Sequence, residues 1–109
     1  MDRILLKSKL YGIKVTDATV NYDGSIAIDA NWLQEVGICQ YEQVHVLNVT
    51  NGKRFITYAL NTDREQVCVY GAAAKLVNIG DELIVLAYGI SSKPIKPQIE
   101  GKYGSGNSS

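Results

Sequence analysis

Short runs in which apolar and polar residues alternate fill most of the chain, and turn residues separate them. The alternation predicts strands over residues 11–20, 25–29, 43–49, 54–60 and 66–70. Between residues 82 and 88 the apolar positions are nearly continuous, which predicts a strand buried on both faces. Asp23-Gly24 and Asn51-Gly52 have the composition of two-residue turns, so we expect a hairpin at each.

Two short segments interrupt the alternation and predict helices. Asn31, followed three residues later by Gln34, resembles a capping box, and Gly37 is expected to end that helix. A second helix is expected over residues 71–77 and should end at residues 78–80.

The number and shortness of these strands favour a small closed barrel, because closure removes exposed sheet edges. Residues 1–90 are expected to form this domain. Residues 91–109, with Lys-Pro pairs followed by Gly and Ser, are expected to form an extended arm and a disordered tail.

Composition narrows the class of protein. Apolar residues make up 46% of the 109 residues, which is typical of a globular chain. The 11 Lys and Arg residues balance the 11 Asp and Glu residues, which argues against a nucleic-acid partner. No signal peptide and no apolar run of membrane-spanning length is evident, so we expect a cytoplasmic location and no membrane partner.

The cysteines and the single histidine do not indicate a metal site. Cys39 and Cys68 lack zinc-ligand spacing and are expected to be buried free thiols. His45 is the only histidine, which excludes a cluster of His ligands, and alternation places it opposite the main apolar row. We therefore predict no metal.

Several polar segments that are ordinary when taken singly form a distinctive set in this order and spacing. Together they resemble the aspartate 1-decarboxylase family, over about residues 1–88. The segments are Lys7-Ser8-Lys9, Val15-Thr16, Tyr22-Asp23-Gly24-Ser25, Ile28-Asp29, Glu42-Gln43-Val44, Asn51-Gly52-Lys53-Arg54, Thr57-Tyr58-Ala59, Gly71-Ala72-Ala73-Ala74 and Gly80-Asp81.

The resemblance implies a mainly β fold: a small six-stranded double-psi β-barrel with one or two short helices, assembled as a homotetramer. It also implies an inactive precursor that cuts itself between Gly24 and Ser25 into residues 1–24 and 25–109. Ser25 would then become a covalent pyruvoyl group, with no metal. Some relatives need a separate maturation protein, and the sequence leaves open whether this chain does.

The residue types at the implied cut suit that chemistry. The Ser25 hydroxyl can attack the Gly24 carbonyl carbon, provided that the turn holds both groups in position. Gly24 has no Cβ, so it can adopt a conformation in which the hydroxyl approaches closely. By resemblance, Thr57 stabilises the oxyanion and Tyr58 returns a proton to carbon after CO₂ is lost, as a tyrosine protonated at neutral pH can.

The implied reaction converts L-aspartate to β-alanine and CO₂, through a Schiff base between the pyruvoyl ketone and the substrate amine. The two substrate carboxylates need positive partners, and Lys9 and Arg54 are the candidates. By resemblance, Thr57 and the backbone N–H groups of Gly71, Ala72 and Ala73 would also bind the substrate. Tyr22 and Tyr70 would support the site. The family builds its site between subunits, so a monomer is expected to be inactive.

The chain departs from the family's usual pattern in three places. Tyr70 stands where an Asn is usual, Leu10-Tyr11-Gly12 replaces Ile-His-Arg, and the β segment that usually follows the barrel is not evident. Two alternatives therefore stay open. Beside decarboxylation of L-aspartate, the first is a paralogue that decarboxylates a different amino acid because of Tyr70, and the second is an uncleaved, non-enzymatic barrel that serves in binding.

Overall fold

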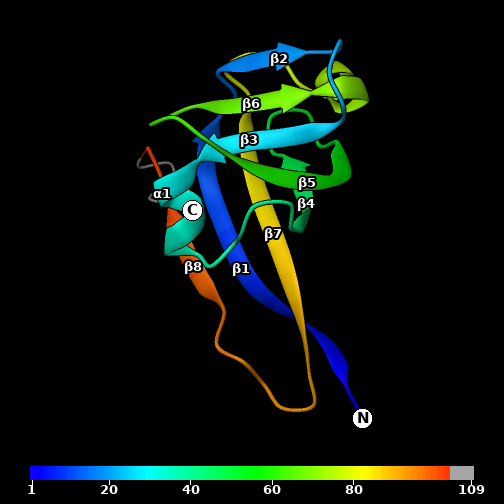
Figure 1. Cartoon of the computed structure of the whole chain (residues 1–109), viewed down its shortest axis with the longest axis vertical. Helices are drawn as coiled ribbons and strands as arrows, with labels where there is room; N and C mark the ends of the chain where they lie inside the picture. Colours follow the sequence, from blue (N-terminus) through cyan, green and yellow to red (C-terminus); the bar gives the residue numbers. More distant parts are fainter. Residues whose placement is uncertain (104–109) are drawn as a thin grey trace.

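Strands dominate the computed structural model, which describes residues 1–103 (Figure 1). One α-helix and one 3₁₀ helix interrupt them. In chain order the elements are β1 (Arg3–Lys14), β2 (Asp17–Thr19), β3 (Ser25–Asp29), α1 (Ala30–Glu35), β4 (Gln43–Asn48), β5 (Arg54–Thr62), β6 (Val67–Tyr70), η1 (Gly71–Leu76), β7 (Glu82–Ser91) and β8 (Gln98–Gly101).

The strands lie side by side in the order β2-β6-β3-β5-β4-β7-β1-β8. The pairs β2–β6, β3–β5 and β1–β8 are parallel, and the other pairs are antiparallel. Only Val15 and Thr16 separate β1 from β2, so two strands far apart in this order are consecutive in the chain. The Thr16 N–H donates to the Val67 carbonyl at 2.8 Å, which ties the junction to β6 and makes the sheet curl back on itself.

The prediction of a mainly β fold with one or two short helices is confirmed. The strands expected over residues 25–29, 43–49, 54–60, 66–70 and 82–88 correspond to β3–β7. The strand expected over residues 11–20 is divided into the end of β1 and the whole of β2, and β8 was not expected. The order of hydrogen-bonded strands begins at β2 and ends at β8, so the described strands do not form a closed ring.

One of the two predicted hairpins is confirmed and the other is wrong. β4 and β5 pair antiparallel around Asn51-Gly52, where Gly52 has a φ of 79° and its N–H donates to the Asn48 carbonyl at 2.8 Å. The strands on either side of Asp23-Gly24 do not pair with each other. β2 and β3 lie on opposite edges of β6, so the Asp23-Gly24 segment passes over that strand instead of forming a tight turn.

Strands β4 and β7 bury one face only. In β7, Leu83, Val85 and Ala87 are buried, whereas Ile84 and Leu86 are half-buried, so the predicted burial on both faces is wrong. The placement of His45 opposite the buried row of β4 is confirmed. Figure 1 shows the ends of β1 and β7 extending well below the rest of the sheet, toward the N-terminus.

Both predicted helices are present, with shifted ends. Asp29, not Asn31, caps α1: its carboxylate accepts hydrogen bonds from the Asn31 and Trp32 N–H groups at 2.8 and 3.3 Å. Gly37 follows with a φ of 73°, as expected of a residue that ends a helix. The second helix is η1.

The segment after residue 91, predicted as an extended arm, returns to the sheet. Its strand β8 pairs in parallel with β1, with Ser8 opposite Gln98 and Tyr11 opposite Gly101. Figure 1 shows β8 running beside β1 below α1. The predicted disordered tail, residues 104–109, lies outside the described residues.

The core lies inside the curled sheet, where Leu10, Ile26, Ile28, Leu33 and Val44 are fully buried among other aliphatic side chains. Of the two cysteines, Cys68 is buried as predicted, but Cys39 is exposed, so that half of the prediction is wrong. No helix in the described part of the chain is long and apolar enough to span a membrane.

Candidate active site

The Gly24–Ser25 bond lies where the segment that crosses β6 enters β3. Ser25 is the first residue of β3 and only 2% exposed, and its hydroxyl donates to the Asp23 carbonyl at 3.3 Å. The hydroxyl is thus turned back toward the residue that precedes Gly24. The side chain and the carbonyl that it is expected to attack therefore belong to one short bend.

Gly71 holds this bend against the end of β6. It has a φ of 75°, and a Cβ placed on it would lie 2.6 Å from the Cα and the N atom of Gly24 and 2.9 Å from the Tyr22 carbonyl oxygen. Contacts that short are not tolerated, so only glycine fits at this position. The backbones of Gly24 and Gly71 are therefore packed directly on each other.

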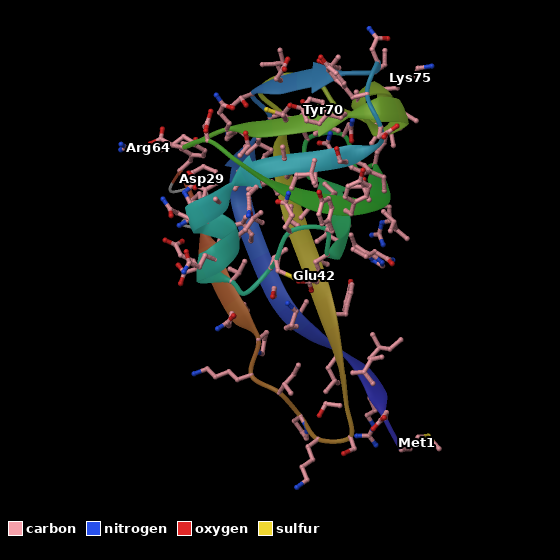
Figure 2. All side chains as sticks on the ribbon, viewed as in Figure 1. Met1, Asp29, Glu42, Arg64, Tyr70 and Lys75 are labelled. Carbon is pink, nitrogen blue, oxygen red and sulfur yellow. The ribbon has the colours of Figure 1, made fainter. Side chains whose placement is uncertain are left out.

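A cavity of ≈ 640 Å³ opens beside Ser25. Four of the predicted site residues line it: Ser25, Tyr22, Tyr58 and Tyr70. They come from β3, the preceding segment, β5 and β6, and Figure 2 labels Tyr70 on β6. The rest of the lining, which sequence reasoning missed, is formed by Asp17, Thr19, Asp23, Tyr41 and Leu60.

Tyrosines form two walls of this cavity. The Tyr22 and Tyr70 rings meet edge to face with centroids 5.4 Å apart, and the Tyr41 and Tyr58 rings lie 6.1 Å apart. Burial raises the pKa of Tyr70 above its ordinary value, and hydrogen bonding to the Cys68 thiol adds to the shift. The Tyr70 phenol is therefore neutral and able to donate a hydrogen bond throughout the physiological pH range.

Thr57 is not among the residues that line the cavity, and its relation to the scissile bond follows from strand register. β3 and β5 run parallel with Ile26 opposite Ala59, and extending that register by two residues brings Thr57 level with Gly24. Gly71 contacts Gly24 directly, and Ala72 and Ala73 follow it at the start of η1. The structure thus places Gly71 against the Gly24 backbone, next to Ser25.

Lys9 and Arg54 lie on another surface, which we call the outer face. Cross-strand pairing places side chains of β1, β7, β4 and β5 in rows on it: Lys9, Leu86, His45 and Ile56 form one row, and Tyr11, Ile84, Leu47 and Arg54 the next. Arg54 is exposed and lines a second hollow of ≈ 490 Å³ with His45 and Leu86. The Lys9 ammonium lies 5.7 Å from the centre of the Tyr11 ring.

The two cationic residues therefore do not join Ser25 in the single chain. Within residues 1–103, neither a lysine nor an arginine lines the cavity at Ser25, whereas Asp17 and Asp23 do. A cavity with two carboxylates and no cation in its lining repels an acidic substrate. Tyr58 belongs to both regions, because it follows Arg54 and Ile56 on the same face of β5 and also lines the cavity.

Some of the missed lining residues carried a signal in the sequence. Asp17 and Thr19 are two positions apart in a strand, so their side chains share a face, and β2 places both beside the cavity. Tyr41 gave no such signal. It has a φ of 70° in the turn before β4, and only the tertiary structure brings it next to Tyr58.

Comparison with known proteins gives a consistent picture. The family model described as aspartate decarboxylase matches residues 1–102. Proteins named aspartate 1-decarboxylase are 48% identical in Haloquadratum walsbyi (90% of this chain, 86% of the relative), 45% in Campylobacter jejuni (91% and 82%) and 43% in Thermoanaerobacter pseudethanolicus (91% and 90%). The crystal structure of a rationally designed protein, mkDPBB_sym_86, overlaps with a TM-score of 0.49 at 16% identity, covering 71% of this chain and 91% of that one.

Proposed function

The chain belongs to the aspartate decarboxylase family, and from this premise we propose that it converts L-aspartate to β-alanine and CO₂. It is thus a carboxy-lyase that serves pantothenate and coenzyme A biosynthesis. The observation that carries the proposal is the match to that family over residues 1–102. The cavity beside Ser25, with Tyr58 in its lining, supports it.

The active form arises by self-cleavage at Gly24–Ser25. The Ser25 oxygen bonds to the Gly24 carbonyl carbon as the C–N bond breaks, which turns the amide into an ester and frees the Ser25 amine. Thr57, level with Gly24 by strand register, donates to the oxyanion of this step. Elimination then releases the Gly24 carboxylate and leaves a dehydroalanine, which gains one water and loses ammonia to become a pyruvoyl group.

The residues around Ser25 fit such a group. Ser25 is buried at the cavity wall, so a group derived from it is held by the fold on one side and open to substrate on the other. The pyruvoyl ketone supplies an electrophile for the substrate amine and a sink for the electrons left when CO₂ departs. Tyr58, from its position in the lining, holds the proton that the carbon must gain.

The substrate carboxylates are bound by Lys9 and Arg54 of a neighbouring copy in a homotetramer. Support comes from the separation between the outer face, which carries both cations, and the cavity, whose described lining carries none. The exposed apolar residues Ile4, Ile56 and Ile90 near the outer face suit contact with another copy. Backbone N–H groups of Gly71, Ala72 and Ala73 complete the substrate contacts, and Tyr22 supports the wall.

The two alternatives make different predictions. A paralogue with a changed substrate would cleave itself and ignore L-aspartate, whereas a binding barrel would remain one chain. A maturation protein, if the chain needs one, would affect only the cleavage. The cytoplasmic location stays a prediction.

The direct test is to incubate the purified protein with L-aspartate and to measure β-alanine and CO₂. Wild-type protein is expected to form both in equal amounts, and Ser25→Ala should form neither. Activity in an uncut Ser25→Ala protein would contradict the mechanism. A cleaved wild-type protein that leaves L-aspartate untouched would contradict the proposed substrate.

A further inference from the structure

The wall of the cavity next to Ser25 is formed by an aromatic pair, Tyr70 and Tyr22. We propose that Tyr70 is a specificity-determining residue: its ring limits the length of the acidic side chain that the site accepts. An amino acid with a β-carboxylate is thereby favoured over the homologue that is one methylene longer. The inference rests on the proposed function and names a determinant of its substrate range.

The pairing of β6 places the Tyr70 ring beside the reacting position. Tyr70 lies opposite Ser25 in the antiparallel β3–β6 pair, and directly opposed residues project their side chains to the same face with Cβ atoms about 5 Å apart. On the other edge of β6, Thr19 lies opposite Tyr70 and also lines the cavity. The ring is therefore the large side chain in a row that contains Ser25.

Tyr70 is also the fixed member of the aromatic pair. Its strand is hydrogen-bonded on both edges, to β2 and β3, and Gly71 packs against the Gly24 backbone immediately after it. Tyr22, by contrast, is 66% exposed and lies outside the strands, on the short fragment that cleavage at Gly24–Ser25 would leave. Tyr70 is therefore the member of the pair that the sheet holds on both sides.

The effect of the ring is one of shape rather than of charge. Burial raises the pKa of Tyr70, so the phenol adds no negative charge that would repel a carboxylate. The Tyr22 and Tyr70 rings meet edge to face at an interplanar angle of 75°, and the pairing of β6 on both edges holds the backbone of Tyr70 in place. A longer substrate would have to displace the ring, whereas a shorter one would not.

The test compares kcat/KM for L-aspartate and L-glutamate in wild type, Tyr70→Ala and Tyr70→Phe. Rates are expressed per cleaved chain, counted by mass. One methylene is worth about 10- to 200-fold in discrimination by a close-fitting site, so Tyr70→Ala should shift the ratio toward L-glutamate by at least about tenfold. Tyr70→Phe keeps the ring and should hold the ratio within about twofold.

Tyr103→Ala is the matched control. Tyr103 also meets an aromatic neighbour edge to face, Trp32 at 5.5 Å, but it does not line the cavity. Its removal should leave the ratio unchanged. A ratio that moves equally in Tyr70→Ala and Tyr103→Ala would overturn the inference, because it would report general loosening of the fold.

The remaining outcomes also decide the question. An unchanged ratio in cleaved Tyr70→Ala overturns the inference, as does a shift in Tyr70→Phe as large as that in Tyr70→Ala. If Tyr70→Ala does not cleave itself, the comparison is made with Tyr70→Leu. If neither variant cleaves itself, Tyr70 acts in processing and the inference is overturned. Cleaved wild type that does not act on L-aspartate contradicts the proposed function, independently of any Tyr70 variant.

Discussion

The cavity at Ser25 and the outer face with Lys9 and Arg54 differ in whether one chain brings their proposed functional residues together. At the cavity, Ser25 is buried, Gly71 packs on Gly24, and Thr57 is level with the scissile bond. On the outer face, Arg54 is exposed and lines a separate hollow. The first region is tightly built within one chain, and the second presents its cations outward.

This difference separates two requirements of the proposed enzyme. The proposed self-cleavage involves Gly24, Ser25 and Gly71, which lie together in one chain. Binding a substrate with two carboxylates needs cations, and these lie on a surface that another copy can bring to the cavity. Variants of the first region should therefore block maturation, whereas variants of the outer face should spare maturation and reduce turnover.

The largest effect is expected from Gly71→Ala. The new Cβ would lie 2.6 Å from Gly24 backbone atoms, so the bend must move and the Ser25 hydroxyl must lose its alignment. Cleavage should fall to an undetectable level, measured by intact mass. Gly89→Ala is the control, because its Cβ would meet no atom closer than 3.7 Å and should leave cleavage intact. Normal cleavage of Gly71→Ala would mean that the contact has no role in maturation.

Tyr58→Phe tests the residue that belongs to both regions. Its ring remains, so cleavage should proceed, while loss of the hydroxyl removes the proposed proton donor. Turnover of L-aspartate should fall by about 10²- to 10⁴-fold, the usual contribution of a general acid. The measurement is kcat per cleaved chain. Wild-type turnover in this variant would remove Tyr58 from the proton-donor role.

Arg54→Ala tests the outer face. The protein should cleave as wild type does, and kcat/KM for L-aspartate should fall by about 100-fold, because a substrate carboxylate loses a charged partner. Steady-state kinetics on protein of known cleaved fraction provides the measurement. A defect in cleavage instead of turnover would assign Arg54 to the first region.

Mixing variants sharpens the same comparison. Ser25→Ala chains keep Arg54 but cannot form the reacting group, and Arg54→Ala chains have the opposite defect. If the site is shared between copies, co-expression of the two should recover part of the wild-type activity. Activity no higher than that of Arg54→Ala alone would place both residues in the site of one chain.

The smallest effect is expected on the free energy of unfolding, from Asp81, which lies outside both the cavity and the outer face. The buried Asp81 carboxylate accepts from the Asn48 side chain at 2.8 Å and the Asn78 N–H at 2.9 Å, and these bonds lower its pKa. A carboxyl with a lowered pKa stabilises the fold above its ordinary value of about 4, and this contribution is lost as pH falls through the lowered pKa. Urea unfolding should show Asp81→Asn less stable at neutral pH, with the difference shrinking in acid. A constant difference would rule out the ionised form as the source.

The sequence predicted those elements whose signal is local. The hairpin at Asn51-Gly52 and the strand pattern of β4 follow from turn chemistry and side-chain alternation. Asp23-Gly24 has the same turn composition, yet it connects two strands that do not pair with each other. Strand β6 lies between them and pairs with β2 on one edge and with β3 on the other. Local composition does not specify which strand lies between two others.

Two features were not predicted from the sequence: strand β8, and the separation of Lys9 and Arg54 from the cavity at Ser25. All four residues of β8 are exposed, so the strand is held by backbone pairing to β1 and shows no apolar alternation. The family resemblance named the site residues but not their distances. The pairing of β6 with β3 places Tyr70 beside Ser25, and the register of β5 on β4 places Arg54 on the outer face.

The intact mass of the purified protein under denaturing conditions tests the central claim most directly. We predict two fragments, residues 1–24 and 25–109. The larger should lack a free amino terminus and be lighter by one ammonia than the product of simple hydrolysis. A single full-length chain that nevertheless converts L-aspartate to β-alanine would contradict the account.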